Sequence, residues 1–331
     1  MATRAMGVHH VHRVHPVHRG AMSVFEAILL GIIQGLTEFL PISSSGHLAV
    51  VERLLGREVP LAFDVLLHFA SLAAVVIVLW GDLWSLLTAR RRLILPLVIG
   101  TIPAGLAGVL LGDLLAGAKH NMLVVGCCFM VTGLVLAVGE RLARSRGADR
   151  NLTGIGIADA VIVGLAQAAA LLPGVSRSGS TISAGRMRGV SREDCVRFSF
   201  LLAVPVIAGA GVMEAPEMLE MAGGIGAVPL AAGAVAGLAA SILAIKLLLG
   251  IVRRMSVGVF SYYCLPLGML LFVLNAPAPV SRVLSAVLSI ASGPARIIAY
   301  VLIAVFLAAV IRFVFFGLLR GERSAPPLAP E

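Results

Sequence analysis

The chain has 331 residues, of which 59% are hydrophobic and only 13% are charged. With a mean hydropathy of +1.00, this composition lies far outside the range of soluble domains and indicates an integral membrane protein. The net charge of +9 could suggest nucleic-acid binding, but the basic residues fall in short clusters between apolar runs, where they set orientation in a bilayer. We therefore expect neither a soluble enzyme nor a nucleic-acid partner.

The N-terminal segment has a composition unlike the rest of the chain. Residues 1–20 hold five of the eight histidines and no apolar stretch, so they form neither a cleavable signal peptide nor a span. A metal-binding tail is one interpretation. We favour an unordered extension over residues 1–21, which could be untranslated if Met22 is the true start.

Seven apolar runs are long enough to cross the hydrocarbon core, which takes about 20 helical residues. They cover residues 61–80, 93–115, 122–142, 196–213, 225–249, 257–274 and 297–319. Two further apolar stretches, residues 25–51 and 155–189, are interrupted by Pro, Gly and hydroxyl residues. Such interruptions predict helix pairs that enter the membrane and turn back, because broken backbone is tolerated only where it faces protein or a cavity.

The two interrupted stretches resemble each other at a fixed offset of 133 residues. The matching pairs are Gly31/Gly164, Gln34/Gln167, Ser43/Ser176, Ser45/Ser178, Gly46/Gly179 and Gly56/Gly189. Each half then continues with three spans, over residues 24–142 and 155–275. Because three crossings is an odd number, the second copy must be inverted relative to the first, an architecture that places its site near the midplane.

The predicted fold is therefore an all-α integral membrane protein with an inverted-topology repeat, two re-entrant helix pairs and six core transmembrane helices. Residues 22–275 form this core. Residues 276–331 form a C-terminal extension with one additional transmembrane helix, over residues 297–319.

The loop charges predict the orientation of these spans. Alternate loops are rich in basic residues, which are Arg90–Arg92, Arg141, Arg144, Arg146, Arg150, Arg186, Arg188, Arg192, Arg197, Lys246, Arg253 and Arg254. The opposite loops carry few basic residues and the acidic stretch 214–220. Since basic loops stay in the cytoplasm, we expect the first re-entrant pair to open outward and the second to open inward.

The first interrupted stretch contains "QGLTEFLPISSSGHL", residues 34–48. Gln34 and Glu38 are four residues apart, so on a helix they share one face and can converge on a cation or a polar partner. Pro41 ends that helix. Ser43–Ser45 then form a polar turn, and His47 begins the next helix.

The second stretch contains "LLPGVSRSGSTIS", residues 171–183, with polar groups at Ser176, Arg177, Ser178, Gly179 and Thr181. Hydroxyls, free N–H groups at a helix start and one guanidinium together predict a phosphate-binding site. An arginine near the bilayer centre costs about 2.5–3.5 kcal/mol, so something must offset it. A purely structural ion pair between Arg177 and Glu38, with serines bonded to helix carbonyls, is the alternative.

These two motifs resemble the signatures of the undecaprenyl-diphosphate phosphatase family of the bacitracin-resistance type. The resemblance also includes "FSFLLAVPVIAG", residues 198–209, and extends over about residues 22–274. It implies hydrolysis of a C55 isoprenoid diphosphate to its monophosphate at the outer side of the bacterial cytoplasmic membrane. Such a reaction recycles the lipid carrier for peptidoglycan synthesis and gives tolerance to bacitracin.

The resemblance also implies the roles of individual residues. Glu38, Ser44, His47 and Arg177 would be catalytic, and a divalent cation, Mg²⁺ or Ca²⁺, would be held by Glu38 and Gln34. From the two motifs themselves we expect phosphate to be bound by Ser43, Ser45, Ser176, Arg177, Ser178, Gly179 and Thr181. The nucleophile is either Ser44, activated by His47, or a water that His47 or Glu38 deprotonates. Some members of the family have Glu and others have Gln at the position of Gln34, so a metal site with two carboxylates is not implied here.

Two other functions fit parts of the pattern. An inverted-repeat transporter or flippase could bind a lipid phosphate in the same place without hydrolysing it. The type 2 phosphatidic-acid phosphatases share an "SGH" element, but they also need a lysine and arginine block upstream and a second histidine with a nearby aspartate downstream. We find neither, since the chain has no histidine after His120. Small residues at 233–241 could pack two copies into a homodimer, although such residues more often pack neighbouring helices of one chain.

Overall fold

A computed structural model describes residues 22–276, except residues 57, 146, 148 and 222–224. The N-terminal extension, residues 1–21, and the predicted seventh span, residues 297–319, therefore lie outside the described residues. Within that part of the chain every regular element is a helix, and the only β-type pairing is one isolated bridge between Arg150 and Val190. The all-α prediction is confirmed for these residues.

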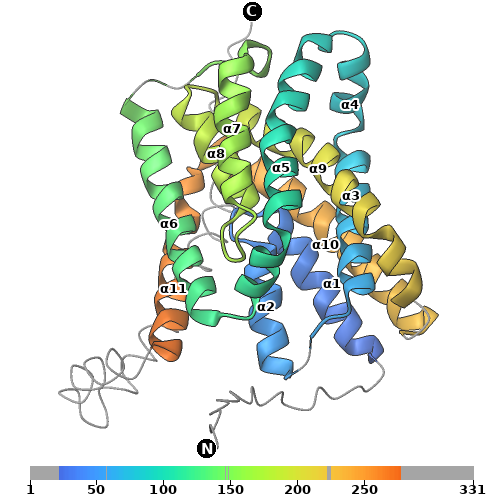
Figure 1. Ribbon diagram of the computed structural model, residues 1–331. Helices are drawn as coiled ribbons and strands as arrows, with labels where there is room; N and C mark the ends of the chain where they lie inside the picture. Colours follow the sequence, from blue (N-terminus) through green and yellow to red (C-terminus); the bar gives the residue numbers. More distant parts are fainter. Residues whose placement is uncertain (1–21, 57, 146, 148, 222–224, 277–331) are drawn as a thin grey trace, which may run out of the picture.

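The helices follow one another without long connections (Figure 1). Their bounds are α1 Val24–Phe39, α2 Ser44–Leu55, α3 Leu61–Val78, α4 Trp80–Leu87, η1 Arg91–Leu93, α5 Ile94–Lys119, α6 Met122–Ser145, η2 Leu152–Gly154, α7 Ile157–Ala169, α8 Arg177–Met187, α9 Arg192–Met221, α10 Ala227–Arg254, η4 Val257–Phe260 and α11 Ser261–Asn275. Six helical segments are long and apolar enough to cross a membrane, and these correspond to the six predicted core spans.

Helix α9 extends beyond both ends of the apolar run predicted from hydropathy, residues 196–213. It starts at Arg192, because Ser191 caps it: the Ser191 hydroxyl accepts from the Asp194 amide at 3.2 Å and donates to the Asp194 carboxylate at 2.9 Å. The first of these bonds satisfies one of the amides that a helix start leaves unpaired. The helix also continues to Met221, so that Glu214 lies on it and not in a loop.

The two interrupted stretches form the predicted helix pairs, α1–α2 and α7–α8. Figure 1 shows that they enter the bundle from opposite ends and that their breaks lie near its middle. Each break contains a proline, Pro41 and Pro173. Proline ends helices because it lacks an amide hydrogen and restricts the residue before it.

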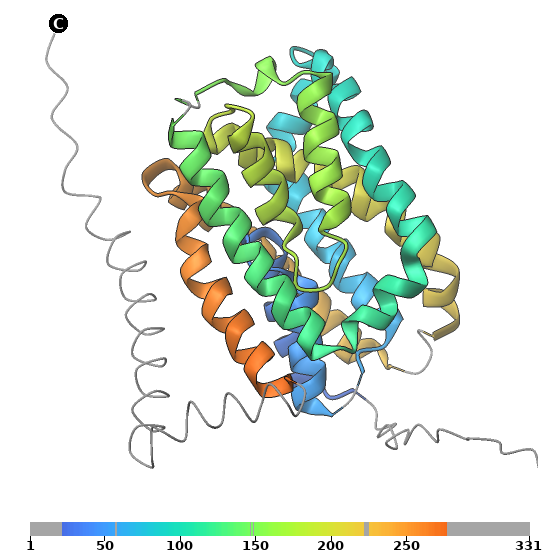
Figure 2. The same cartoon turned by 60° about the vertical axis from the view of Figure 1, so that its left-hand side comes forward.

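The packing of the long helices is reciprocal between the two halves. Helix α1 packs against α10 as α7 packs against α5, while α3 packs against α9 and α6 against α11 (Figures 1 and 2). A Cβ atom added to Gly31 would lie 2.3 Å from the carbonyl oxygen of Gly233, and one added to Gly164 would lie 2.6 Å from that of Gly100. The matched glycines therefore allow matched helices to approach closely.

Small residues within 233–241 pack α10 against another helix of the same chain. Gly233 and Gly237 lie on α10 against the backbone of Gly31 on α1. Packing between neighbouring helices, the commoner use of such residues, accounts for both glycines. A homodimer stays a prediction.

Candidate active site

The first break is held open by a strained serine. Helix α1 ends at Phe39, and Ser43 then adopts φ +70°, which makes it the only non-glycine residue with positive φ in the described part of the chain. Such a conformation persists only where surrounding bonds impose it. Here the Ser43 hydroxyl caps α2 by accepting from the Gly46 amide at 3.4 Å. The turn therefore presents Ser44 and Ser45 at the start of α2.

The second break repeats the helix cap. The Ser176 hydroxyl caps α8 by accepting from the Gly179 amide at 3.0 Å, although the positive φ, +99°, lies two residues earlier, at Gly174. Ser43 and Gly46 thus have the same relation to α2 as Ser176 and Gly179 have to α8. The offset of 133 residues found in the sequence corresponds to equivalent helix caps.

The two breaks are bonded directly to each other. The Ser43 hydroxyl donates to the carbonyl of Val175 at 3.3 Å, and the Ser178 hydroxyl donates to the carbonyl of Leu40 at 3.1 Å. Thr132 on α6 supports the second break, since its hydroxyl accepts from the Ser176 amide and donates to the Gly174 carbonyl, both at 2.9 Å. The two bonds between the breaks join residues that are 132 and 138 positions apart in the sequence.

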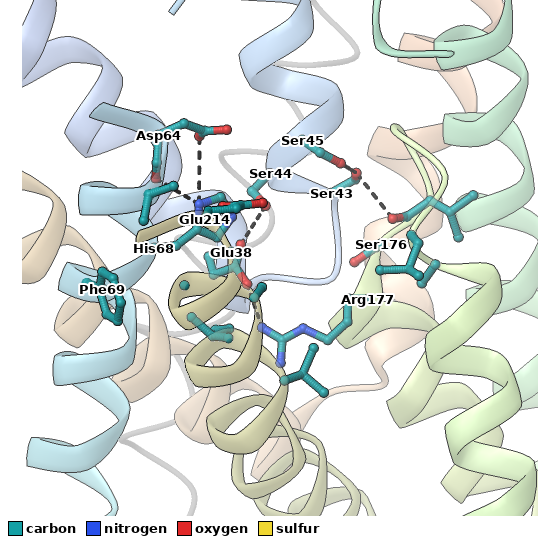
Figure 3. Close-up of a pocket in the computed structure, with 18 residues that line it drawn as sticks. Glu38, Ser43, Ser44, Ser45, Asp64, His68, Phe69, Ser176, Arg177 and Glu214 are labelled. Carbon is teal, nitrogen blue, oxygen red and sulfur yellow. Dashed lines mark hydrogen bonds and ion pairs between the residues drawn. The ribbon is translucent and has the colours of Figure 1, made fainter. Parts of the chain in front are cut away.

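Glu38 lies at the centre of the contact between the breaks. Its Oε1 accepts a 2.5 Å hydrogen bond from Nη2 of Arg177, and its Oε2 accepts from the Ser44 hydroxyl at 2.6 Å and from Nε2 of Gln34 at 3.1 Å. Figure 3 shows the carboxylate between the serine turn and the guanidinium. The side chains of Glu38 and Arg177 are 8% and 15% exposed, so each is the main charge partner of the other.

A cavity of about 240 Å³ adjoins this pair. Both breaks and the helices α3 and α9 line it, with Ser43–Ser45 and Ser176 on one side and Asp64, His68 and Glu214 on the other (Figure 3). Its wall therefore combines one guanidinium, several hydroxyls and three carboxylates. A ligand in this cavity would meet the serine turn and the ion pair together.

Two buried polar atoms at the cavity have no hydrogen-bond partner among the described residues. They are Nη1 of Arg177, a donor, and Oδ1 of Asp64, an acceptor. A buried polar atom left unpaired costs about 1–3 kcal/mol, so such atoms are rare unless a ligand completes them. The guanidinium donor without a hydrogen bond fits an anion, and the carboxylate oxygen, whose nearest charged neighbour is Nδ1 of His68 at 3.7 Å, fits a cation or a donor.

Comparisons with known proteins place the chain in a family. The model of the family described as "Bacitracin resistance protein BacA" matches residues 27–270. The chain belongs to the BacA family. It is 40% identical over 255 residues to an undecaprenyl-diphosphatase of Rhodopirellula baltica, which covers 76% of this chain and 98% of that protein. It is 41% identical over 269 residues to an undecaprenyl-diphosphatase of Syntrophotalea carbinolica, with coverage of 77% and 100%.

In this BacA-family protein, only four of the seven predicted phosphate-binding residues line the cavity. Ser43, Ser45, Ser176 and Arg177 line it, together with Ser44. The other three predicted residues do not line it, and their polar groups have partners elsewhere. The Ser178 hydroxyl bonds to Leu40, the Gly179 amide to Ser176, and the Thr181 hydroxyl to Ser199 at 2.6 Å.

His47 forms no hydrogen bond with Ser44. Its Nδ1 lies 2.6 Å from the Ser43 carbonyl, its Nε2 lies 2.7 Å from the hydroxyl of Tyr263 on α11, and it is absent from the cavity wall. The ring also stacks on Tyr263, with ring centroids 5.7 Å apart. Both ring nitrogens are therefore engaged in holding the turn, and activation of Ser44 by His47 stays a prediction without a contact between them.

Gln34 does not reach the cavity, where a metal ligand would have to lie. Its side chain is fully buried, it does not line the cavity, and its amide donates to Glu38. Among the described residues no three His, Cys, Asp or Glu side chains are close enough to hold a metal ion alone. Mg²⁺ is commonly bound through one or two carboxylates plus substrate phosphates, and Glu38 and Asp64 fit that requirement.

Sequence reasoning missed three ionisable residues of the cavity wall. Asp64 and His68 lie one turn apart on α3, and Nδ1 of His68 is 2.8 Å from the Asp64 carbonyl and 3.7 Å from its carboxylate. Glu214 approaches from α9. An Asp and a His four residues apart inside an apolar span were a usable signal, because ionisable residues at that depth usually mark a functional site.

Proposed function

We propose that this protein hydrolyses undecaprenyl diphosphate to undecaprenyl phosphate and inorganic phosphate. The single observation that best supports this function is the cavity in which a free guanidinium donor of Arg177 adjoins the Ser44–Glu38 hydrogen bond. A guanidinium donates charge-assisted hydrogen bonds to phosphate oxygens. The names of the relatives, undecaprenyl-diphosphatase, agree with that chemistry.

Arg177 would bind the terminal phosphate of the lipid. Its Nη2 is held by Glu38, which fixes the guanidinium plane, and its Nη1 is available to a phosphate oxygen. Phosphoryl transfer requires mainly positioning and neutralisation of charge on the transferred group. A fixed arginine that bonds an oxygen of this group supplies both, since it needs no reorganisation during the reaction.

Ser44 is our candidate nucleophile, with Glu38 as its base. The Ser44 oxygen would attack the terminal phosphorus while its proton passes to Oε2 of Glu38, 2.6 Å away. The bond between that phosphorus and the bridging oxygen breaks, and its electron pair leaves with the lipid monophosphate. Water then attacks the phosphoserine and gives one proton to solvent, while the proton held by Glu38 returns to the Ser44 oxygen as phosphate is released.

Direct attack by water is the other mechanism that the sequence left open. In that case Glu38 would deprotonate a water in the cavity and Ser44 would only bind the phosphate. The short Ser44–Glu38 bond supports the serine mechanism, because it orients the hydroxyl proton toward a carboxylate. The two mechanisms differ in one product, a phosphoserine, which acid quenching can preserve.

A divalent cation, when bound by Glu38 and Asp64, would neutralise charge on the diphosphate and polarise its oxygens. Asp64 offers an oxygen without a hydrogen-bond partner, and Glu38 lines the same cavity. Gln34 would act behind this pair by orienting the Glu38 carboxylate through its amide.

We also propose that the cavity opens to the outer side of the bacterial cytoplasmic membrane. The cavity reaches Asp64 near the first turn of α3 and Glu214 near the end of α9. The arginines concentrate at the opposite end of the bundle, where α6 and α10 end and α9 begins. Basic ends remain in the cytoplasm. Outward opening would place hydrolysis where the carrier is released during peptidoglycan synthesis, and excess activity would give bacitracin tolerance.

Phosphate release by the purified protein in detergent tests the function. We expect release from undecaprenyl diphosphate that depends on a divalent cation and stops when a chelator is added. Detergent abolishes transport but not hydrolysis, so a transporter or flippase would release no phosphate. Absence of release from a protein that still unfolds cooperatively would refute the proposal.

A further inference from the structure

A second cavity, of about 450 Å³, lies at the basic end of the bundle. None of the residues that line it lines the cavity beside Glu38. It is formed where α6 ends, α9 begins and α10 passes through η4 into α11. Its polar lining consists of Arg141, Arg144, Arg192, Arg254, Glu140, Ser256, Ser261 and Tyr262. We call this the basic pocket.

The basic pocket has more positive than negative charge. Its one carboxylate, Glu140, is 4% exposed and accepts from Nε and Nη2 of Arg192 at 3.0 and 2.5 Å. Nε of Arg144 lies 3.5 Å from the same oxygen. Arg141 makes no ion pair with any residue that the structure describes. One buried carboxylate cannot neutralise these guanidinium groups, so the pocket favours an anion.

Two apolar stripes lead away from the basic pocket along neighbouring helices. On α6, Leu134 and Val138 are 58% and 42% exposed and share a face with Arg141, because they precede it by seven and three residues. On α11, Leu265 and Met269 are 37% and 53% exposed and share a face with Tyr262, which lines the pocket. Helices α6 and α11 run side by side (Figure 2).

We propose that the basic pocket binds the phosphate headgroup of an anionic membrane lipid, whose acyl chains lie along α6 and α11. The pocket lies at the end of four spans, at the depth where headgroups meet water, and the stripes begin at its rim. Basic pockets between spanning helices on the cytoplasmic side favour anionic headgroups in this way. The exposed leucine and valine match acyl chains, whereas a soluble phosphate would have no use for them.

This inference is independent of the catalytic proposal, since it concerns the opposite end of the molecule. Its test is binding by the full-length protein in detergent, measured by native mass spectrometry. The probes are phosphatidylglycerol and phosphatidylcholine with identical acyl chains, so that only the headgroup charge differs. We expect the wild-type protein to bind phosphatidylglycerol roughly tenfold more tightly, since the clustered arginines attract the anionic headgroup and not the zwitterionic one.

The test variant is Arg141→Gln/Arg144→Gln, which removes two charges from the basic pocket. Its matched control is Arg91→Gln/Arg92→Gln, which also removes two charges at this end of the helix bundle. Both arginines are exposed, and neither lines a cavity. We expect the test variant to lose the preference for phosphatidylglycerol and the control to keep it. Arg141→Lys/Arg144→Lys, which keeps the charge, should retain most of the preference.

Three outcomes would overturn the proposal. Equal binding of both lipids by the wild-type protein would exclude selection of anionic headgroups. An equal loss in test and control variants would show attraction by overall charge and no defined site. Displacement of phosphatidylglycerol by millimolar inorganic phosphate would assign the pocket to free phosphate. Both variants are first checked for wild-type melting temperature, and Arg141→Gln alone replaces a test variant that does not fold.

Discussion

The hydroxyl of Ser44 and the carboxylate of Glu38 are joined by a 2.6 Å hydrogen bond across the first break. Residue 44 begins α2 and residue 38 belongs to the last turn of α1, so the break itself brings them together. The other oxygen of Glu38 is bonded to Arg177. One carboxylate therefore orients both the candidate nucleophile and the candidate phosphate ligand.

Replacing Ser44 with alanine should reduce kcat by about 10³-fold or more if the serine is the nucleophile, because loss of a nucleophile that acts with its base has effects of that order or larger. Ser45→Ala is the comparison. Its hydroxyl contacts Ser43 at 3.4 Å and not Glu38, so the loss should be less than about tenfold. Acid quenching with labelled substrate should trap a phosphoserine at Ser44. A Ser44→Ala enzyme with nearly full activity would leave direct attack by water as the mechanism.

Arg177→Ala should abolish phosphate release and also destabilise the protein. Removing one partner of a buried ion pair leaves the other unpaired and costs about 3–5 kcal/mol. The double variant Glu38→Gln/Arg177→Met separates these effects, since it removes both charges. We expect it to regain most of the wild-type melting temperature in detergent but no activity. Recovery of activity by the double variant would contradict our assignment of the pair.

Much of the architecture was predictable because it depends on local patterns. Apolar runs of about 20 residues predicted the six spans, and Pro41 and Pro173 predicted the two breaks. From the sequence, an ion pair between Glu38 and Arg177 was the purely structural alternative to a phosphate-binding site. The ion pair does form, at 2.5 Å. What favours a functional interpretation is the unpartnered Nη1 of Arg177 at a cavity, which no sequence pattern could reveal.

The composition of the cavity wall was harder to predict because it depends on how distant helices pack. Asp64 and Glu214 are 150 positions apart and meet at the cavity only because α3 packs against α9. Hydropathy ended the α9 span at residue 213, and so placed Glu214 in a loop. His47 was expected beside the nucleophile from its position in the sequence, yet the helical turn directs its ring toward Tyr263, 216 positions away.

Tyr263→Phe tests whether His47 acts by holding the serine turn. The variant removes the hydroxyl that lies 2.7 Å from Nε2 of His47, and a buried group left unpaired costs about 1–3 kcal/mol. We expect kcat/KM to fall about tenfold. If the two side chains act as one unit, adding Tyr263→Phe to His47→Ala should cause little further loss. Independent, multiplicative losses would show that His47 has a role separate from this contact.

Gly31→Ala should destabilise the bundle by about 1–3 kcal/mol, the usual cost of overpacking. The added methyl group would lie 2.3 Å from the carbonyl oxygen of Gly233, where only backbone surrounds it. Gly108→Ala on α5 is the matched control, because no atom lies within 4 Å of its added Cβ. Thermal unfolding in detergent should separate the two variants. Equal melting temperatures would mean that α1 and α10 are not closely packed at Gly31.

Asp64→Asn should raise the Mg²⁺ concentration needed for half-maximal phosphate release by about tenfold, the scale of effects that residues around metal sites have on affinity. The substitution preserves size but removes the charge from the buried oxygen that has no hydrogen-bond partner. Glu58→Gln is the control, since Glu58 is 67% exposed at the same end of the bundle and lines neither cavity. The Mg²⁺ requirement is measured by titration of chelated enzyme at saturating substrate. If Asp64→Asn lowers kcat without moving that requirement, Asp64 does not hold the cation, and its unpartnered oxygen must instead accept a hydrogen bond from the substrate or from water.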